Sequence, residues 1–434
     1  MDFNEAKKLV YAEKIMSDKL TTDNVKALMK ELLFNPDSMK IIHISGTNGK
    51  GSTSAYLTQI LIEAGCRVGR FSSPAVFDYL EIFTINNERM SEKDYADCVS
   101  KVMEKVDVLK NTYTFSAFEL EVAIALTYFY DSECDFVIME TGMGGTLDAT
   151  NFIENTLLSI ITSVGMDHMQ FLGSTLGKIA ANKAGIIKRD SVVISALQEK
   201  TALEVIKNKA RDMNAEFIPV NEVSGVKYSE EATFMKYITA DGEMFEVSTK
   251  MPGCFQCLNI PNAIEAAGYL KKAGYNIRKE NIVTGIMNTR WPGRFEKINS
   301  HPDFYIDGGH NRAAAENIRK TLEIYFTNKK IIYIIGVLAD KDYEGVLEIT
   351  ADFAEKIFTV TPTENKRALD GKILAECAAK YNNNVLFVPE IGEAVELALA
   401  EAGDDGIVLS FGSLSYLGKV KSMVNSIMEK RYGR

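Results

Sequence analysis

The chain contains 434 residues, of which 46% are hydrophobic and 25% are charged, and its formal net charge is −10. This length is more than one hydrophobic core normally serves, so we expect two domains. The acidic balance argues against nucleic acid and against anionic membranes as partners, although an acidic protein can still hold a local basic pocket for anions.

The sequence carries no signal for export or membrane insertion. Its N-terminal segment is charged and amphipathic and lacks the apolar core of a signal peptide, and its longest apolar runs are too short to span a bilayer. The six cysteines are scattered, and the single Cys254-x-x-Cys257 pair lacks the further ligands of a zinc site. We therefore expect a cytoplasmic protein that acts as a monomer.

Apolar runs of strand length alternate with amphipathic stretches of helix length, which is typical of an α/β fold with mostly parallel strands. In the N-terminal half this pattern predicts strands at 40–45, 66–73, 136–140 and 157–165 and helices at 51–65, 117–131 and 175–188. Near 221–250 the residues alternate around Asp241-Gly242, which predicts a small antiparallel section.

Regular alternation resumes after the turn signal Trp291-Pro292-Gly293. It predicts a helix at the C-terminus, a helix at 311–326 and strands at 303–307, 331–337 and 406–413. We therefore predict a large N-terminal domain at 1–291 and a smaller C-terminal α/β domain at 292–434.

The stretch HISGTNGKGSTS, at His43–Ser54, looks like a phosphate-binding loop, although it departs from the Walker consensus sequence. It lies between a predicted strand and a predicted helix, where backbone N–H groups and the helix dipole favour phosphate, and Lys50 adds a positive charge. The residues expected to contact a nucleotide are Gly46, Thr47, Asn48, Gly49, Lys50, Gly51, Ser52 and Thr53. These features predict a nucleotide site and leave its reaction open.

Further polar residues follow predicted strands, at the position where ligands collect in open α/β sheets. Glu140 ends an apolar run and is a candidate Mg²⁺ ligand, since Mg²⁺ prefers hard oxygen donors. His168 follows another strand and is a candidate metal ligand. Lys183 lies on the next predicted helix, where periodicity alone favours a lysine on the helix surface.

The C-terminal domain repeats this arrangement. Asp307 and His310 follow one predicted strand, residues 340–342 follow a second, and Ser413 follows a third. Three polar clusters at strand ends predict a face that closes over the nucleotide of the first domain.

Nearly the whole chain carries an ordered set of motifs, namely GTNGKGS, SSP, SAFE, ETGMGGTLDATN, DHMQFLG, KIAANKAGIIK, NIPNA, WPGRFE, DGGHN, ADKD and FGSLSYLG. Together they resemble the folylpolyglutamate synthase/dihydrofolate synthase family of the Mur ligase superfamily. The resemblance implies a P-loop ATPase domain followed by a Rossmann-like domain. It also implies an ATP-dependent ligase that joins L-glutamate to the glutamyl carboxylate of a (tetrahydro)folate through an acyl phosphate, releasing ADP and phosphate.

The resemblance also assigns roles to individual residues. The ATP contacts outside the loop would be Asn262, Arg294 and Asp307, and the ligands of two Mg²⁺ ions would be Ser73, Glu140, His168 and a carbamylated Lys183. The contacts to glutamate or the γ-phosphate would be His310 and Ser413, and the catalytic residues would be Lys50, Lys183, Asp307 and His310. The candidates for binding the pteroate group are Ser116, Phe118, Leu147, Asp148 and Ala149.

One departure concerns the second activity of the family. Bifunctional members commonly carry an acidic-Leu-Gly segment near the N-terminus that helps to bind dihydropteroate, and residues 17–32 contain no such segment. We therefore expect polyglutamylation of a reduced folate as the main activity and leave glutamylation of dihydropteroate open.

Three alternatives fit the sequence less well. Peptidoglycan Mur ligases carry an extra N-terminal domain for the UDP-sugar, whereas the loop here begins at Gly46. A small-molecule kinase or NTPase would not require a second α/β domain with the DGGHN motif. A catalytically idle nucleotide-binding module would not need Lys50, Glu140, His168 and Lys183 together.

Overall fold

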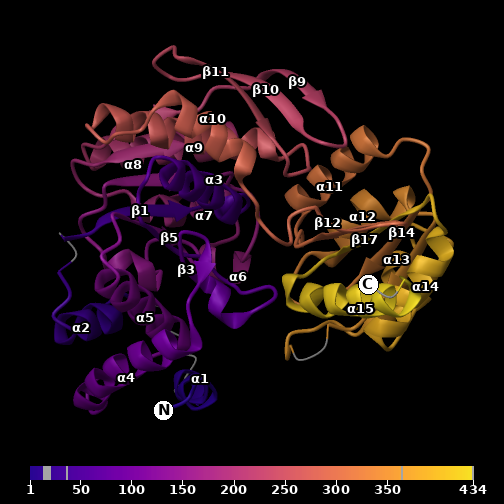
Figure 1. Cartoon of the computed structure of the whole chain (residues 1–434), viewed down its shortest axis with the longest axis horizontal. Coiled ribbons are helices and arrows are strands. Elements are labelled where there is room, and N and C mark those ends of the chain that lie inside the picture. The colour runs from indigo at the N-terminus through magenta and orange to yellow at the C-terminus, as the bar shows by residue number, and fades with distance from the viewer. Residues whose placement is uncertain (13–20, 36–37, 363–364, 433–434) are drawn as a thin grey trace. The chain divides into compact units, whose positions relative to one another are not determined.

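The computed structural model describes residues 1–12, 21–35, 38–362 and 365–432, so the first part of segment 17–32 lies outside the described residues (Figure 1). The chain divides into two compact units. The first contains Met1–Gly225, Met235–Ser248 and Cys257–Thr289, and the second contains Val226–Phe234, Thr249–Gln256 and Arg290–Arg434. The domain boundary predicted between residues 291 and 292 stays a prediction.

The first unit is built on an eight-stranded sheet in the order β4-β3-β2-β5-β1-β6-β7-β8. Its strands are β1 (Lys40–Ser45), β2 (Val68–Phe71), β3 (Phe83–Ile85), β4 (Glu88–Arg89), β5 (Phe136–Glu140), β6 (Leu158–Ile161), β7 (Val192–Ser195) and β8 (Glu216–Pro219). In this order, each neighbouring pair between β2 and β8 is parallel. At the other edge of the sheet, β3 pairs antiparallel with both β2 and β4. The predicted, mostly parallel sheet is therefore confirmed.

Helices pack on this sheet, and α3 to α8 lie along the connections between its strands. They are α1 (Phe3–Ala12), α2 (Asp23–Glu31), α3 (Lys50–Glu63), α4 (Glu92–Leu109), α5 (Ala117–Asp131), α6 (Met169–Leu172), α7 (Leu176–Lys183), α8 (Lys200–Asp212), α9 (Gln256–Lys272) and α10 (Lys279–Asn288). Helix α5 packs in one core cluster with Ile41, Val137 and Met139, and α10 packs on α3. In the described part of the chain no helix combines the length and apolar character needed to cross a membrane.

The antiparallel section near residue 241 contains one strand more than a hairpin. Strands β9 (Ser224–Tyr228), β10 (Thr233–Ile238) and β11 (Met244–Thr249) lie side by side in this order. The turn between β10 and β11 is closed by hydrogen bonds from Gly242 N to Thr239 O and from Thr239 N to Glu243 O. The predicted turn at Asp241-Gly242 is therefore confirmed.

The second unit contains a six-stranded sheet in the order β12-β13-β17-β14-β15-β16. Its strands are β12 (Glu296–Ser300), β13 (Asp303–Asp307), β14 (Ile331–Ile335), β15 (Lys356–Thr359), β16 (Val385–Phe387) and β17 (Ile407–Phe411), and its helices are α11 (Arg312–Tyr325), α12 (Tyr343–Thr350), α13 (Gly371–Ala378), α14 (Ile391–Ala402) and α15 (Leu417–Tyr432). All pairs are parallel except β12 with β13, an edge pair that the sequence pattern did not predict.

The helix predicted at 175–188 is shorter in the structure. Helix α7 ends at Lys183, and the chain continues as a tight 3₁₀ turn, η4, at Ala184–Ile186. Gly185 allows this turn to pass close to Thr146, since a Cβ at Gly185 would lie 2.1 Å from Thr146 Oγ1. The backbone approach that ends the helix involves a residue distant in sequence, which is why periodicity could not place it.

The core of the first unit contains a buried histidine, His43, on the central strand β1. Burial penalises its imidazolium form and the nearby Lys188 ammonium repels it, and together these effects lower the pKa of His43 to about 3. The unfolded chain binds a proton at a pKa of about 6.5, so unfolding takes up a proton at acidic pH. His43 therefore contributes stability that is present above the unfolded pKa and is lost as the pH falls toward the folded pKa.

We predict that His43 makes the protein sensitive to mild acid. Between neutral pH and about pH 4, the free energy of unfolding of the wild type should fall by about 3 kcal/mol more than that of His43→Gln, whose side chain does not titrate. Urea unfolding followed by circular dichroism at the two pH values measures this difference. Equal losses in the two proteins would contradict the prediction.

Candidate active site

The ends of three adjacent parallel strands bring the predicted site residues of the first unit together. Strand β1 pairs with β5 on one side and β6 on the other, with Ile44 opposite Glu140 and Ser45 opposite Ile161. The glycine-rich loop follows β1, Glu140 ends β5, and residues 162–168 follow β6. Because these strand ends meet at one edge of the sheet, the three polar segments share the position where ligands bind in such folds.

Two glycines in the loop after β1 lie close against side chains from distant segments. A Cβ at Gly46 would lie 1.8 Å from Thr162 Oγ1, and a Cβ at Gly49 would lie 2.2 Å from Asn259 Oδ1. Gly49 also has a φ of +87° and is the N-cap residue of α3. Helix α3 therefore begins directly at Lys50, and its first N–H groups, which have no acceptor within a helix, are suited to bind phosphate.

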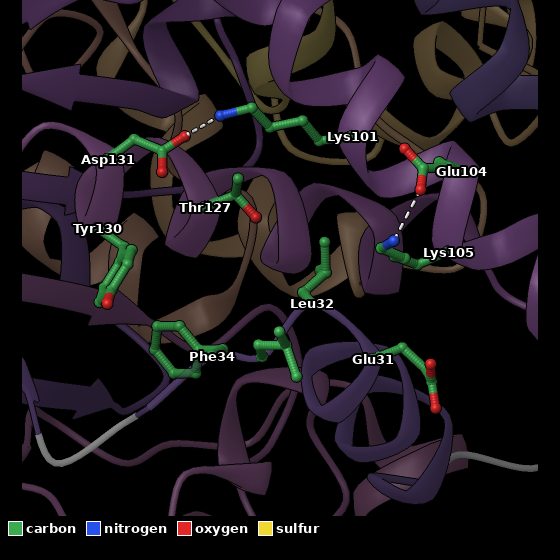
Figure 2. Close-up of a pocket in the computed structure, with 10 residues that line it drawn as sticks. Glu31, Leu32, Phe34, Lys101, Glu104, Lys105, Thr127, Tyr130 and Asp131 are labelled. Atoms are coloured by element: carbon green, nitrogen blue, oxygen red, sulfur yellow. Dashed lines mark hydrogen bonds and ion pairs between the residues drawn. The ribbon is translucent and has the colours of Figure 1, made fainter.

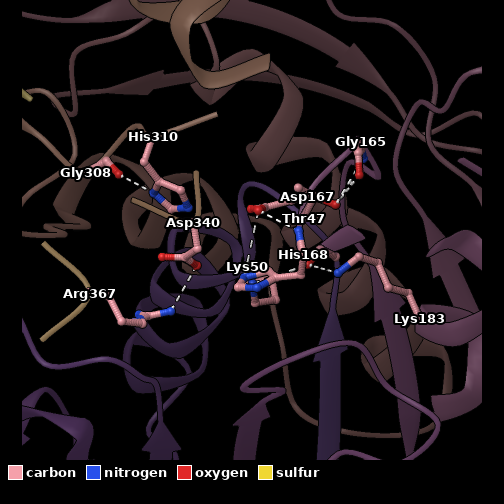
Figure 3. A network of polar contacts seen from close by, with 11 residues as sticks. Thr47, Lys50, Gly165, Asp167, His168, Lys183, Gly308, His310, Asp340 and Arg367 are labelled. Carbon is pink, nitrogen blue, oxygen red and sulfur yellow. Dashed lines mark hydrogen bonds and ion pairs between the residues drawn. The ribbon is translucent and has the colours of Figure 1, made fainter. Parts of the chain in front are cut away.

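The middle of the loop is fixed to the segment after β6 (Figure 3). The backbone N–H groups of Thr47 and Asn48 donate to Ser163 O at 2.8 and 3.2 Å. The Thr47 hydroxyl donates to Gly165 O and accepts from Gly165 N, both at 3.0 Å. Since these two N–H groups are engaged within the protein, the amide donors suited to phosphate are those at the start of α3.

Two lysines converge on the carbonyl of Gly46. Lys50 Nζ lies 3.3 Å from Gly46 O and 3.8 Å from the Glu140 carboxylate, and Lys183 Nζ donates to the same carbonyl at 2.7 Å. Lys183 is only 4% exposed, so the periodicity that favoured a surface lysine was misleading. Its helix carries it into the site because α7 ends at this residue, beside the loop. The Lys50 ammonium can neutralise charge on bound phosphates.

The other predicted metal ligands lie at neighbouring positions of the same sheet edge. Ser73 follows β2, the strand beside β5, and is joined to Pro74 by a cis peptide bond. His168 has a φ of +49° and is the N-cap residue of α6, with its Nε2 4.0 Å from Asp167 Oδ1. Within the described ranges, no group of three or more His, Cys, Asp or Glu side chains could by itself hold a metal ion.

The predicted pteroate residues lie on the loop at residues 142–150, called here the 142–150 loop, and at the start of α5. Asp148 is buried, and its carboxylate accepts hydrogen bonds from the backbone N–H groups of Met143 and Thr150 at 2.8 and 3.0 Å. Burial raises the pKa of Asp148, and these hydrogen bonds oppose that rise. Leu147 is exposed, whereas Ala149 is buried. The Asp148 carboxylate therefore holds the loop in its conformation by accepting hydrogen bonds from the loop backbone.

At the start of α5, Ser116 has a structural role in the helix cap. Its hydroxyl accepts from Glu119 N, and the Glu119 carboxylate accepts from Ser116 N, which is a capping box. The Phe118 ring packs against the 142–150 loop, since a Cβ at Gly142 would lie 2.5 Å from it. These contacts set the position of the first turn of α5 beside the loop.

In the second unit, Asp307 lies at the end of β13 and holds the turn that follows it. Its carboxylate accepts from Phe295 N at 2.8 Å and from Gly309 N at 2.7 Å. Burial raises the pKa of Asp307, while the positive charge of Arg294 opposes the rise. A Cβ at Gly308 would lie 2.2 Å from Arg294 Nη1, so this glycine admits the guanidinium beside the turn.

Three more predicted residues have defined surroundings within their own units. His310 Nδ1 lies 2.8 Å from Gly308 O (Figure 3), and since a carbonyl only accepts, Nδ1 carries the proton. Ser413 caps the short turn η6 (Leu414–Tyr416) that follows β17. Asn262 is buried on α9, where its Nδ2 donates to Leu258 O at 2.8 Å, while its Oδ1 has no hydrogen-bond partner among the described residues. The orphan acceptor is consistent with a ligand contact.

Sequence reasoning missed the residues that support the phosphate loop and the 142–150 loop. Thr162 and Asn259 face Gly46 and Gly49, and Ser45 Oγ donates to Gly144 O at 2.6 Å. No local pattern marks these residues, because each contact joins positions that are far apart in the chain. The glycines were the available signal, since a glycine at a strand-to-helix turn implies a close neighbour.

The first unit also contains a surface cavity of about 310 Å³ (Figure 2). It is bordered by the ends of α2 and α5 and by α4, and it is lined by Glu31, Leu32, Leu33, Phe34, Lys101, Glu104, Lys105, Thr127, Tyr130 and Asp131. Tyr130 lies at the opposite end of α5 from Ser116, about 20 Å along the helix. The cavity is therefore separate from the predicted pteroate residues.

Comparisons with known proteins agree with this geometry. The Mur ligase middle domain matches residues 44–267, and the domain described as Mur ligase, glutamate ligase domain matches residues 293–414. The dihydrofolate synthase/folylpolyglutamate synthase of Bacillus subtilis is 32% identical over 405 residues, which cover 92% of this chain and 93% of that protein.

Solved structures share the fold over almost the full length. A folylpolyglutamate synthase from Thermotoga maritima superposes with a TM-score of 0.82 and 28% identity, covering 98% of this chain and 97% of that chain. A folylpolyglutamate synthase from Mycobacterium tuberculosis, solved with ADP, superposes with a TM-score of 0.89 and 24% identity, covering 97% and 98% of the two chains. The chain therefore belongs to the folylpolyglutamate synthase/dihydrofolate synthase family of the Mur ligase superfamily.

Proposed function

We propose that this protein is an ATP-dependent ligase that joins the amino group of L-glutamate to the glutamyl carboxylate of a reduced folate. The observation that carries the proposal is the convergence of the loop after β1, Lys50, Lys183 and the buried Glu140 at one sheet edge, in a chain of this family. The products are the folylpolyglutamate, ADP and phosphate.

The chemistry explains why the site consists mainly of charges and backbone donors. A carboxylate is a poor acyl donor, so the folate carboxylate first attacks the γ-phosphorus of ATP, forming an acyl phosphate and ADP. The glutamate amine then attacks the acyl carbon, and phosphate leaves. The protein must hold two anions in line, neutralise the charge that develops and exclude water. At the phosphates, the N–H groups at the start of α3 hold the anion, and the Lys50 ammonium neutralises charge.

The donors at the sheet edge fit nucleotide-bound magnesium. Glu140 and Ser73 offer oxygen donors, and His168 offers an imidazole. Mg²⁺ usually keeps several waters and binds through one or two carboxylates plus substrate phosphates, so a small donor set suits it. When bound, the metal would neutralise charge on the phosphates during transfer. We assign Ser73, Glu140, His168 and Lys183 to two such sites.

We further propose that Lys183 is carbamylated in the active enzyme. The Lys183 Nζ donates to Gly46 O at 2.7 Å, and a carbamate keeps one N–H on this atom, so this hydrogen bond is compatible with the modification. The two added oxygens would turn a buried cation into an oxygen donor at the metal edge. The close packing of Gly145 against Lys183, where a Cβ would lie 2.7 Å from Lys183 O, fixes the backbone that carries it.

A second activity, the addition of glutamate to dihydropteroate, is favoured by one specific observation. The Bacillus subtilis relative is named for both dihydrofolate synthase and folylpolyglutamate synthase activity and matches 92% of this chain. We assign the pteroate group to Ser116, Phe118, Leu147, Asp148 and Ala149.

The remaining assignments concern ATP and glutamate. We assign further ATP contacts to Asn262, Arg294 and Asp307 and contacts to glutamate or the γ-phosphate to His310 and Ser413. The orphan Asn262 Oδ1 and the proton on His310 Nδ1 support these roles.

The substrate requirement tests the function directly. ADP release should need both tetrahydrofolate and L-glutamate, because the acyl phosphate is discharged only by the amine. A coupled assay with each substrate omitted in turn measures this requirement, and dihydropteroate in place of tetrahydrofolate tests the second activity. ATP turnover that is indifferent to glutamate would rule out the ligase.

Replacing Lys183 tests the carbamate. Lys183→Ala should lower kcat by about a hundredfold or more, and short carboxylates such as formate should restore part of it, because they can replace the missing oxygens. Lys183→Arg retains a cation and a donor but cannot be carbamylated, so it should be as inactive as Lys183→Ala. An active Lys183→Arg enzyme would show that the cation alone suffices.

The close approach at Gly49 gives a test of the phosphate loop. Gly49→Ala should raise the KM for ATP by about tenfold or more, because the new Cβ displaces the Asn259 side chain that lies against the phosphate loop. Gly65→Ala is the matched control, since Gly65 has a φ of +85° at the other end of α3 and a Cβ there would meet no described atom within 4 Å. A KM for ATP that changes equally in both variants would contradict the assignment.

A further inference from the structure

The 142–150 loop is held by the hydroxyl of its own last residue, Thr150. Thr150 Oγ1 donates to Asp148 Oδ1 at 2.6 Å, in addition to the hydrogen bond from Thr150 N. Asp148 Oδ2 accepts from Met143 N at the other end of the loop. The Asp148 carboxylate thus joins both ends of the loop, and Thr150 determines how this carboxylate is oriented.

Thr150 is in turn held by His43 on β1. His43 Nε2 lies 2.7 Å from Thr150 Oγ1, and both residues are fully buried. Because the single hydroxyl proton of Thr150 is donated to Asp148 Oδ1, the proton between His43 and Thr150 must come from Nε2. The contacts therefore form a directed chain in which His43 donates to Thr150 and Thr150 donates to Asp148.

The same face of β1 holds the middle of the loop. Successive residues of a strand point to opposite faces, so His43 and Ser45 point to the same face, toward the loop. Ser45 Oγ donates to Gly144 O at 2.6 Å. Strand β1 ends at Ser45, and the phosphate loop begins at Gly46. One strand therefore fixes both the 142–150 loop and the phosphate loop.

The cost of burying His43 indicates that it serves more than packing. The neighbouring positions Ile41, Ile42 and Ile44 are apolar and fully buried, and an apolar residue at position 43 would continue this pattern. The imidazole Nδ1 is buried without a hydrogen-bond partner among the described residues. A polar ring that is only half satisfied is unfavourable in a core, and such departures concentrate at functional positions.

We propose that His43 is a positioning residue that, through Thr150, fixes the Asp148-centred loop for the folate substrate relative to the phosphate loop. This role rests on the proposed function, because it assumes that the 142–150 loop contacts the pteroate group. His43 touches neither substrate. The hydrogen bond from its Nε2–H leaves the Thr150 hydroxyl to donate to Asp148, and the loop keeps the conformation that the folate requires.

Steady-state kinetics of matched variants test the proposal. His43→Asn places its amide too far from Thr150, whereas His43→Gln places an amide donor near the position of Nε2. We expect His43→Asn and Thr150→Val to raise the KM for folate by about tenfold, with the KM for ATP unchanged within about twofold. The double variant should resemble either single variant, since both break one chain. His43→Gln should restore most of the folate KM.

A control separates positioning from a general loss of packing. Thr359 is fully buried in β15 of the second unit and donates to Gly371 O at 2.8 Å, so Thr359→Val removes a comparable hydrogen bond elsewhere. It should leave the KM for folate unchanged. An unchanged folate KM in His43→Asn, or equal rises in the KM for ATP and for folate, would overturn the proposal.

A spectroscopic readout does not depend on activity. In protein labelled with ¹⁵N-histidine, the His43 signal, identified by its loss in His43→Gln, should report a neutral ring protonated at Nε2 from about pH 5 to about pH 8. A ring protonated at Nδ1 would overturn the directed chain. If the wild type shows this tautomer but no folate-dependent ADP release, the proposed function fails while the hydrogen-bond chain stands.

Discussion

The parallel pairing of β1 with both β5 and β6 decides where the polar groups of the first unit lie. With Ile44 opposite Glu140 and Ser45 opposite Ile161, the three strands end together, and the segments that follow them must share one edge. A slip of one residue in this register would turn each side chain to the opposite face of the sheet. Glu140 would then leave the side of Lys50, and His43 would leave the 142–150 loop.

The register also explains how an acidic protein holds polyphosphate. The net charge of −10 is distributed over the whole chain, whereas the Lys50 ammonium lies at the loop itself, with its Nζ 3.3 Å from the carbonyl of Gly46. Partly buried charges interact more strongly than exposed ones, because less water screens them. The position of a charged side chain beside the phosphates therefore matters more than the net charge of the protein. Gly46 and Gly49 permit this arrangement because they leave room for Thr162 and Asn259.

Much of this arrangement could be predicted from the sequence. The strands at 40–45 and 136–140 and the helix at 117–131 have the predicted bounds, because apolar runs and helical periodicity are local signals. The position of Glu140 at a sheet edge followed from its place after an apolar strand. The predicted nucleotide loop also lies between a strand and a helix, as its glycines indicated.

The features that sequence did not predict depend on contacts between distant segments. Helix α7 stops at Lys183, where the chain passes close to the 142–150 loop, and the Lys183 side chain is buried against the phosphate loop at Gly46. A histidine within an apolar strand gave no indication that its partner is Thr150, more than a hundred residues away. Edge strands such as β12 carry half-exposed side chains and lack the apolar run that marks a central strand.

In the proposed mechanism the γ-phosphate of ATP is transferred to a folate carboxylate before glutamate attacks. Isotope transfer follows this step. With ¹⁸O in the glutamyl carboxylate of the folate substrate, each released phosphate should carry one ¹⁸O atom, which mass spectrometry detects. Phosphate whose fourth oxygen comes from water would contradict it, because the enzyme would then hydrolyse ATP without activating the folate.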